Sequence, residues 1–264
     1  MRALAGLIPL LVCVACGQKV DTPAGPPVCD PDTMNCGYTP PAVGTTPGTG
    51  DEGGASSGGQ EFAKLSGQVL QFGDDYFDKG ALFNGMATVS AIGESGARVS
   101  APYDGTSFQL DGVLKTAANW FLVAPQGNGF VPTLTPVDTR AIQGGTLTVG
   151  MATTADLDGI FLNLGVDRAL ERAQIVLHVV DSQDRTVVGV HASITGIVAY
   201  RAAAVWLTAD DGTDDSGMIF LGNVDAGSAL SMATVTLSGP ANARIEVAIQ
   251  AGAVTVATAV VNTK

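Results

Sequence analysis

The two histidines of the sequence, His178 and His191, are the first candidates for acid–base chemistry, because imidazole titrates near neutral pH. His178 alternates with Val176 and Val180, which predicts a half-buried core position in a strand. His191 is expected on the outward, solvated face of its own strand. No local signature surrounds either residue, although a distant serine and carboxylate can complete a Ser-His-Asp arrangement in space. We therefore expect no catalytic residue and no enzymatic activity, and a secreted hydrolase is the least favoured alternative.

The densest group of carboxylates surrounds Gly212 and Thr213. Closely spaced Asp side chains around a glycine can wrap Ca²⁺, which binds oxygen ligands. The spacing of an EF-hand is absent, however, and no glutamate closes the loop. The sequence therefore favours a solvated acidic turn between two strands, and the alternative is a calcium loop formed by Asp210, Asp211, Asp214 and Asp215. A smaller group, Asp74, Asp75 and Asp78, has the same interpretation.

Aromatic side chains are a third kind of candidate, because exposed rings on a β-sandwich can stack on sugars. The candidates are Tyr103, Trp120, Phe121, Tyr200 and Trp206. Packing in the core explains most of these rings better than ligand binding. An exposed platform at Trp120 or Trp206 would support a carbohydrate-binding module, whereas burial of both indoles would contradict it.

The composition indicates which elements must position these residues. The chain has 264 residues, of which 46% are hydrophobic, 14% are charged and 34 are glycine, and this balance favours β-structure with many turns. A formal net charge of −12 argues against nucleic acid and anionic lipid surfaces as partners. No motif indicates a cofactor.

Short β-like segments separated by turn residues fill two stretches of the sequence, 61–138 and 173–264, which predict two small modules. Residues 104–113 and 215–224 form a weak internal repeat, in which Asp215 corresponds to Asp104. The range 139–172 between the modules is predicted to be a connector.

The connector contains one predicted helix. Thr153 or Thr154 can cap its start and Asp156 lies in its first turn. Apolar residues recur at helical spacing before Gly165, namely Leu157, Ile160, Phe161 and Leu164. This apolar face must pack on one of the modules.

The N-terminal segment predicts export. Arg2 precedes an apolar run over residues 3–15, which is shorter than the ~20 residues that a spanning helix needs and is typical of a secretory signal. The ending Val14-Ala-Cys16-Gly17 resembles the lipobox of bacterial lipoproteins. That resemblance implies cleavage after residue 15, a lipid on Cys16 and, because Gly17 replaces the retention aspartate, the outer membrane of a Gram-negative bacterium. A plain secreted protein cut near the same place is the alternative.

Residues 16–60 are rich in Pro, Gly, Ser and Thr and hold almost no large apolar residues, so they predict a disordered tether. Within it, Cys29 and Cys36 form an even pair once Cys16 carries lipid, and they flank a turn-rich segment. A metal site would need further Cys or His nearby. A small disulfide loop is therefore the favoured interpretation.

The pairing of modules resembles carboxypeptidase-regulatory-like and related Cna-B-like modules. The first module carries the pattern in Gly67-Gln-Val69, Gly85-Met-Ala-Thr-Val89 and residues 104–113, and the second in Val187-Val-Gly189 and residues 215–224. The resemblance implies prealbumin- or immunoglobulin-like sandwiches that serve as stalks, spacers or binding accessories.

Together these features predict an all-β protein with two small antiparallel β-sandwich domains joined by a short helical connector, after a signal at 1–15 and a tether at 16–60. The expected function is that of a non-enzymatic, lipid-anchored envelope protein acting as a structural or interaction element. A protein or glycan partner at the cell surface is expected, and a carbohydrate-binding surface module is the alternative.

Overall fold

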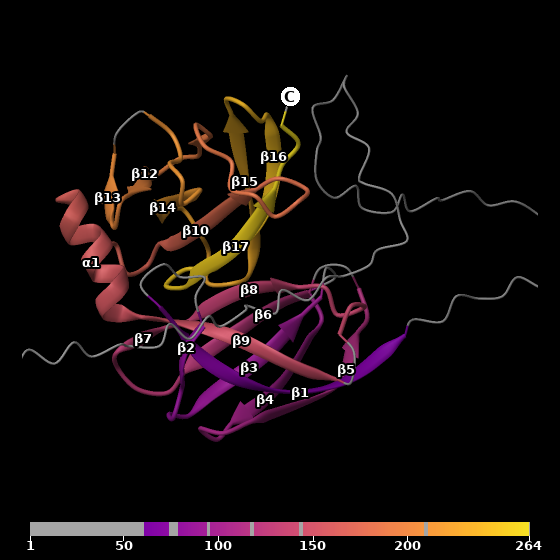
Figure 1. The fold of residues 1–264 in the computed structure, drawn as a ribbon. Coiled ribbons are helices and arrows are strands. Elements are labelled where there is room, and N and C mark those ends of the chain that lie inside the picture. Colours follow the sequence, from indigo (N-terminus) through magenta and orange to yellow (C-terminus); the bar gives the residue numbers. More distant parts are fainter. Residues whose placement is uncertain are drawn as a thin grey trace, which may run out of the picture.

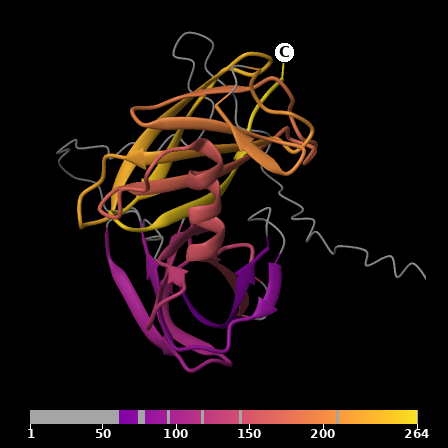
Figure 2. The same cartoon turned by 90° about the vertical axis from the view of Figure 1, so that its left-hand side faces the viewer.

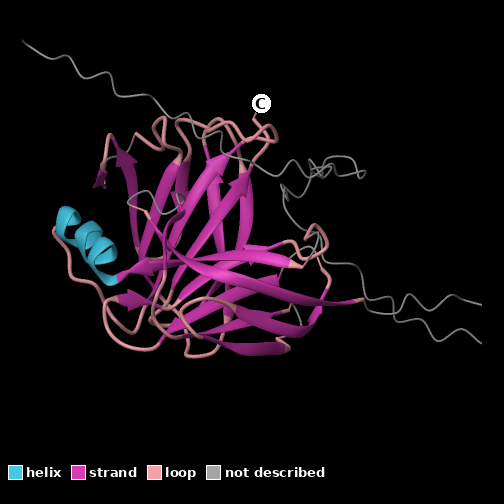
Figure 3. Ribbon diagram, turned by 60° about the horizontal axis from the view of Figure 1, so that its bottom comes forward, coloured by secondary structure: helices cyan, strands magenta, loops and turns pink. Residues whose placement is uncertain are grey.

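The computed structural model describes residues 61–73, 79–93, 96–116, 119–142, 145–208 and 211–263. The predicted signal and tether, with Cys16, Cys29 and Cys36, lie outside the described residues, as do Asp74, Asp75, Asp78 and Asp210. The described part of the chain is almost entirely β-structure with one helix, which confirms the predicted all-β class (Figures 1 and 3).

The first half is a sandwich of two groups of strands. One group has the order β2-β1-β9-β7, and β5 also pairs with β1: β1 (Phe62–Phe72), β2 (Lys79–Leu82), β5 (Phe108–Leu114), β7 (Phe130–Val131), β9 (Thr146–Thr153). The facing group has the order β4-β3-β6-β8: β3 (Ala87–Ile92), β4 (Arg98–Tyr103), β6 (Asn119–Pro125), β8 (Thr133–Val137). Alternate residues point between the layers, so Val69, Val89 and Phe121 share one buried core.

The second half repeats this plan. One layer has the order β13-β12-β14-β10-β17: β10 (Ala173–Val180), β12 (Ile197–Ala202), β13 (Val205–Leu207), β14 (Met218–Val224), β17 (Val254–Val260). The other has the order β11-β15-β16: β11 (His191–Ser193), β15 (Ser231–Ser238), β16 (Ala243–Ile249). In each half the first strand pairs in parallel with the last one, β1 with β9 and β10 with β17.

A continuous sheet joins the two halves. β17 pairs in parallel with β8 through Val254↔Thr133 and Thr255↔Leu134, which produces one nine-stranded sheet. The amide of Val254 also donates to the carbonyl of Pro132 at 2.9 Å. The outer face of the first sandwich takes part as well, because Trp120 and Leu134 belong to the same buried cluster as the core of the second half. The halves therefore lie directly against one another (Figure 2).

The predicted connector at 139–172 needs one correction. β9 lies within this range, and it is an inner strand of the first sheet, hydrogen-bonded in parallel to β1 and antiparallel to β7. β9 could not be predicted from the sequence, because strand pairing between distant segments leaves no local periodicity as clear as that of a helix. The helix and the residues after it provide the link.

The predicted helix is present as α1 (Thr154–Leu164). Thr153 is its N-cap, and its Oγ1 accepts a hydrogen bond from the amide of Asp156 at 3.0 Å. Gly165 ends the helix in the left-handed region at φ 67°, where a side chain would be strained. Leu157, Ile160 and Phe161 are buried, and the Phe161 ring lies edge-on to Phe220 of β14 at 5.4 Å. The apolar face of α1 thus packs on the second half, and its buried cluster also contains Val131 and Ala152 of the first half.

Candidate functional site

The two histidines lie in different sheets. His178 is half-buried in β10, as predicted, where its register partners are Met218 and Thr258. His191 in β11 is also half-buried, with its ring 6.1 Å from that of Tyr200 at 78°. The expectation that His191 is simply solvated is therefore wrong. Neither histidine lines either of the two hollows described below.

The acidic segment around Gly212 is a hydrogen-bonded turn. Asp214 Oδ1 accepts from the amide and hydroxyl of Ser216 at 2.8 and 2.6 Å, and its Oδ2 accepts from the amide of Ala203 at 3.3 Å. Burial alone would raise the pKa of Asp214, but the hydrogen bonds from Ser216 and Ala203 and the charge of Arg201 hold this pKa below its usual value. Both oxygens of Asp214 thus already have partners within the protein.

Thr213 anchors the same turn to the neighbouring loop. Its hydroxyl donates to the carbonyl of Val187 at 2.7 Å and accepts from the amide of Val190 at 3.0 Å. Among the residues that the structure describes, no group of three or more His, Cys, Asp or Glu side chains is placed to hold a metal ion. The geometry of the described part of this segment is that of a structural turn.

Asp104 forms the equivalent turn in the first half. Its Oδ1 accepts from the amide and hydroxyl of Thr106 at 2.9 and 2.6 Å and from the amide of Ser107 at 3.0 Å. The Thr106 hydroxyl, followed by the two amides, lowers the pKa of Asp104 from 3.8 to about 2. Ser216 donates to Asp214 from two residues further along the chain, as Thr106 does to Asp104. The internal repeat is therefore present at this turn. The aspartate that corresponds to Asp104 at this turn is Asp214 rather than the predicted Asp215. Within the strands the repeat keeps the predicted alignment, because residues 219, 221 and 224 lie in the core of the second half as residues 108, 110 and 113 lie in that of the first.

The candidate aromatic residues are all buried. Trp120 is 8% and Trp206 is 4% exposed, and the indole of Trp206 packs against Phe220 with ring centroids 5.8 Å apart. Tyr103 donates its hydroxyl to the carbonyl of Phe83 at 2.7 Å, and the Tyr200 hydroxyl accepts from the amide of Ala192 at 3.0 Å. The alternative of an exposed aromatic platform at Trp120 or Trp206 is therefore wrong, and packing in the core accounts for these rings.

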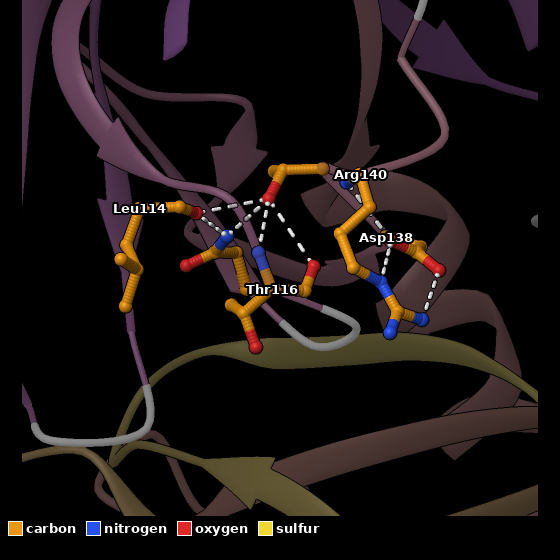
Figure 4. A network of polar contacts seen from close by, with 6 residues as sticks. Leu114, Thr116, Asp138 and Arg140 are labelled. Carbon is orange, nitrogen blue, oxygen red and sulfur yellow. Dashed lines mark hydrogen bonds and ion pairs between the residues drawn. The ribbon is translucent and has the colours of Figure 1, made fainter. Parts of the chain in front are cut away.

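A buried polar network that the sequence analysis missed lies beside β6 (Figure 4). Asn119 donates through Nδ2 to the carbonyl of Leu114 at 2.8 Å and to Thr139 Oγ1 at 2.7 Å. The same Thr139 oxygen accepts from the amide of Thr116 at 3.0 Å and lies 2.9 Å from the carbonyl of Leu114. Asn119 and Thr139 are each 1% exposed, so this network joins the segment between β5 and β6 to the turn after β8 rather than offering a site to solvent.

Beside this network, Arg140 forms a bidentate ion pair with Asp138 (Figure 4). Burial raises the pKa of Asp138, but the hydrogen bonds and charge of Arg140 outweigh it, so the pKa lies below its usual value. Both partners are partly exposed, and the pair reinforces the local turn.

A second structural clamp is Asn223, at φ 54° near the end of β14. Its Oδ1 accepts from the amide of Ala169 at 2.9 Å, its Nδ2 donates to the carbonyl of Asp167 at 3.0 Å, and its own amide donates to Gln174 Oε1 at 2.8 Å. Asparagine tolerates the left-handed region better than most residues. In the sequence, Asn223 is visible as a polar residue inside an apolar strand. This signal does not identify the distant residues with which Asn223 forms hydrogen bonds.

The described surface contains at least two hollows. A cavity of about 150 Å³ at the junction of the halves is lined partly by Phe130, Thr154, Arg168 and Arg172. Its two arginines already have acidic partners, Asp158 at 3.0 Å from Arg168 and Asp225 beside Arg172. A shallower groove of about 580 Å³ lies at one end of the second sandwich, among Ser193, Ile194, Met232 and Thr234. The groove also contains Ser231 and Asp225, but neither hollow is lined by a histidine.

No protein-family model matches the sequence, and no curated protein matches it. Among solved structures, the chain is similar to the Bacillus anthracis TIE protein, with 12% identity over 75% of this chain and a TM-score of 0.23. It spans only 34% of that protein's length. A streptococcal ancillary pilin (10% identity, 76% of this chain and 69% of the pilin, TM-score 0.22) is at a similar distance. The chain is also similar to the shaft pilin spaA from Lactobacillus rhamnosus GG, with 10% identity over 76% of this chain and 99% of the pilin and a TM-score of 0.24. Scores this low carry no argument about function.

The described residues form a β-protein. Most of its polar and aromatic candidate residues make contacts that stabilise the protein itself. Within these residues, no helix combines the length and apolar character needed to cross a lipid bilayer.

Proposed function

We propose that the protein is a non-enzymatic, lipid-anchored component of the cell envelope that presents its two β-sandwich halves as a structural or interaction element. This proposal rests on the contacts that the candidate carboxylates and indoles make within the protein. The carboxylates of Asp104 and Asp214 accept hydrogen bonds within their own turns, and both indoles are buried. A protein that uses these groups to stabilise its own fold is better suited to presenting a surface than to catalysing a reaction.

The N-terminal sequence supports the anchoring part of the proposal. A signal at 1–15, Cys16 as the lipidated residue and a tether at 16–60 would hold the β-body away from the membrane. A flexible segment of this length has an r.m.s. span of roughly 35–40 Å. In the oxidising envelope, Cys29 and Cys36 would form a small disulfide loop within the tether.

The test is a Cys16→Ser variant of the full chain, expressed in a Gram-negative host and followed by membrane fractionation and labelling with a fatty-acid analogue. We expect the unsubstituted chain to take up the label and to separate with outer membranes, and Cys16→Ser to lose both properties. Cys29→Ser is the matched control, because it removes a thiol from the same tether and should leave labelling unchanged. A Cys16→Ser protein that remains membrane-bound would refute the anchor.

A further inference from the structure

We propose that each half of the protein is a mechanical clamp that resists tension applied along the chain. This inference deepens the proposed function and rests on it, because an anchored chain that holds a partner is pulled between its anchor and the point of attachment. The feature that carries it is the parallel pairing of the first and last strands of each half.

In the first half, tension enters through residue 61 and pulls β1 toward its N-terminal end. Once the junction of the halves has separated, including the two register pairs between β17 and β8, tension leaves through residue 153 into α1 and pulls β9 toward its C-terminal end. Because β1 and β9 are parallel neighbours, paired from Ser66↔Thr146 to Gln71↔Met151, these two forces oppose each other along the strand axes. The six register pairs between the strands are therefore loaded in shear, all at the same time.

The second half has the same arrangement. Tension enters β10 at Ala173 and leaves β17 at Val260, and these strands are parallel through seven register pairs, from Gln174↔Val254 to Val180↔Val260. The other edge of each first strand is held as well, since β5 pairs with β1 and β14 pairs with β10. On their other edges, β9 pairs with β7 at Ala152 and Thr153, and β17 pairs with β8 at Val254 and Thr255.

Burial protects these hydrogen bonds from water. Val176 and Leu177 of β10 are fully buried, and Val254 and Val256 of β17 are at most 3% exposed. Water competes poorly for backbone groups in such surroundings, so the bonds must break mechanically rather than by gradual exchange with solvent. Forced unfolding follows the unfolding rate, and shear raises its barrier because no pair can open before the others.

The direction of pulling distinguishes this proposal from ordinary stability. If β1 and β9 are pulled apart from their N-terminal ends, the same hydrogen bonds are loaded one after another and the strands peel. The test is therefore single-molecule pulling on the chain from residue 16 onward. Cys16→Ser and Cys29→Ser remove two thiols, so that Cys36 in the tether serves as the first handle. The second handle is Thr263→Cys for end-to-end tension or Thr146→Cys for peeling, both at exposed positions.

We expect the end-to-end geometry to need a severalfold higher force than the peeling geometry, although both proteins contain the same bonds. Equal forces, or early yielding of either half under end-to-end tension, would overturn the proposal. The second half provides an independent comparison in a Cys36→Ser background, with Glu171→Cys combined with Thr263→Cys for shear or with Ala251→Cys for peeling. Because none of these proteins carries lipid, the outcome does not depend on whether the Cys16 anchor is correct.

Discussion

Asp104 and Asp214 show how single residues set the geometry of this protein. Each carboxylate accepts hydrogen bonds from the amide and the hydroxyl two residues later. Each turn leads into a strand that pairs with the first strand of its half, β5 with β1 and β14 with β10. The ionised form accepts these bonds best, so the pKa of both groups is lowered. The charge at these turns is therefore linked to folding.

This linkage gives a prediction about acid. The pKa of Asp104 falls from an ordinary 3.8 to about 2 on folding, so its contribution is fully present above the ordinary value and is lost as the pH falls toward 2. Asp104→Asn cannot titrate at this position. We expect the stability advantage of the unsubstituted protein over Asp104→Asn, measured by urea denaturation, to be constant at neutral pH and to shrink between the ordinary pKa and the lowered one. An advantage that grows on acidification would contradict this.

At this scale the sequence reveals residue types more readily than their partners. The turn-forming aspartates and the half-buried His178 could be predicted, because their signals lie in adjacent residues. The network of Asn119 and Thr139 and the clamp of Asn223 could not, since the partner of Asn223 lies 54 residues away at Ala169. A distant hydrogen bond leaves no pattern in one sequence.

Among the elements, α1 was predicted almost residue by residue, because capping and helical spacing are local. β9 was missed, because what ends or extends a strand is the neighbour with which it pairs. The two-layer arrangement could be inferred from alternating residues. The joining of β17 to β8 could not, as it depends on how the halves pack.

The helix provides a matched pair of neighbouring residues for testing its packing. Phe161 is buried against Phe220, whereas Leu162 is 81% exposed. We expect Phe161→Ala to lower the free energy of unfolding by about 3–5 kcal/mol, since it removes a buried ring and leaves a cavity. Leu162→Ala should change it by less than ~0.5 kcal/mol. Urea denaturation followed by circular dichroism measures both, and similar losses in the two variants would refute the packing of α1.

For the whole molecule, the shared sheet predicts that the halves unfold together. Trp120 lies in the first half and Trp206 in the second, so Trp206→Phe and Trp120→Phe each leave one fluorescent reporter. We expect the two reporters to give coincident urea transitions, because unfolding either half exposes the apolar junction that contains Trp120 and Leu134. Two separate midpoints would instead mean that the halves are independent domains.

The pairing of β1 with β9 and of β10 with β17 also sets the order in which the chain can fold. Ser66 pairs with Thr146, and Gln174 pairs with Val254. In each half, 80 further residues must therefore be synthesised before the first strand has its parallel partner. At ordinary rates of synthesis that interval lasts about 4–16 s. During this time neither sandwich can close, so under the proposed export the emerging polypeptide would still be unfolded when it reached a narrow channel.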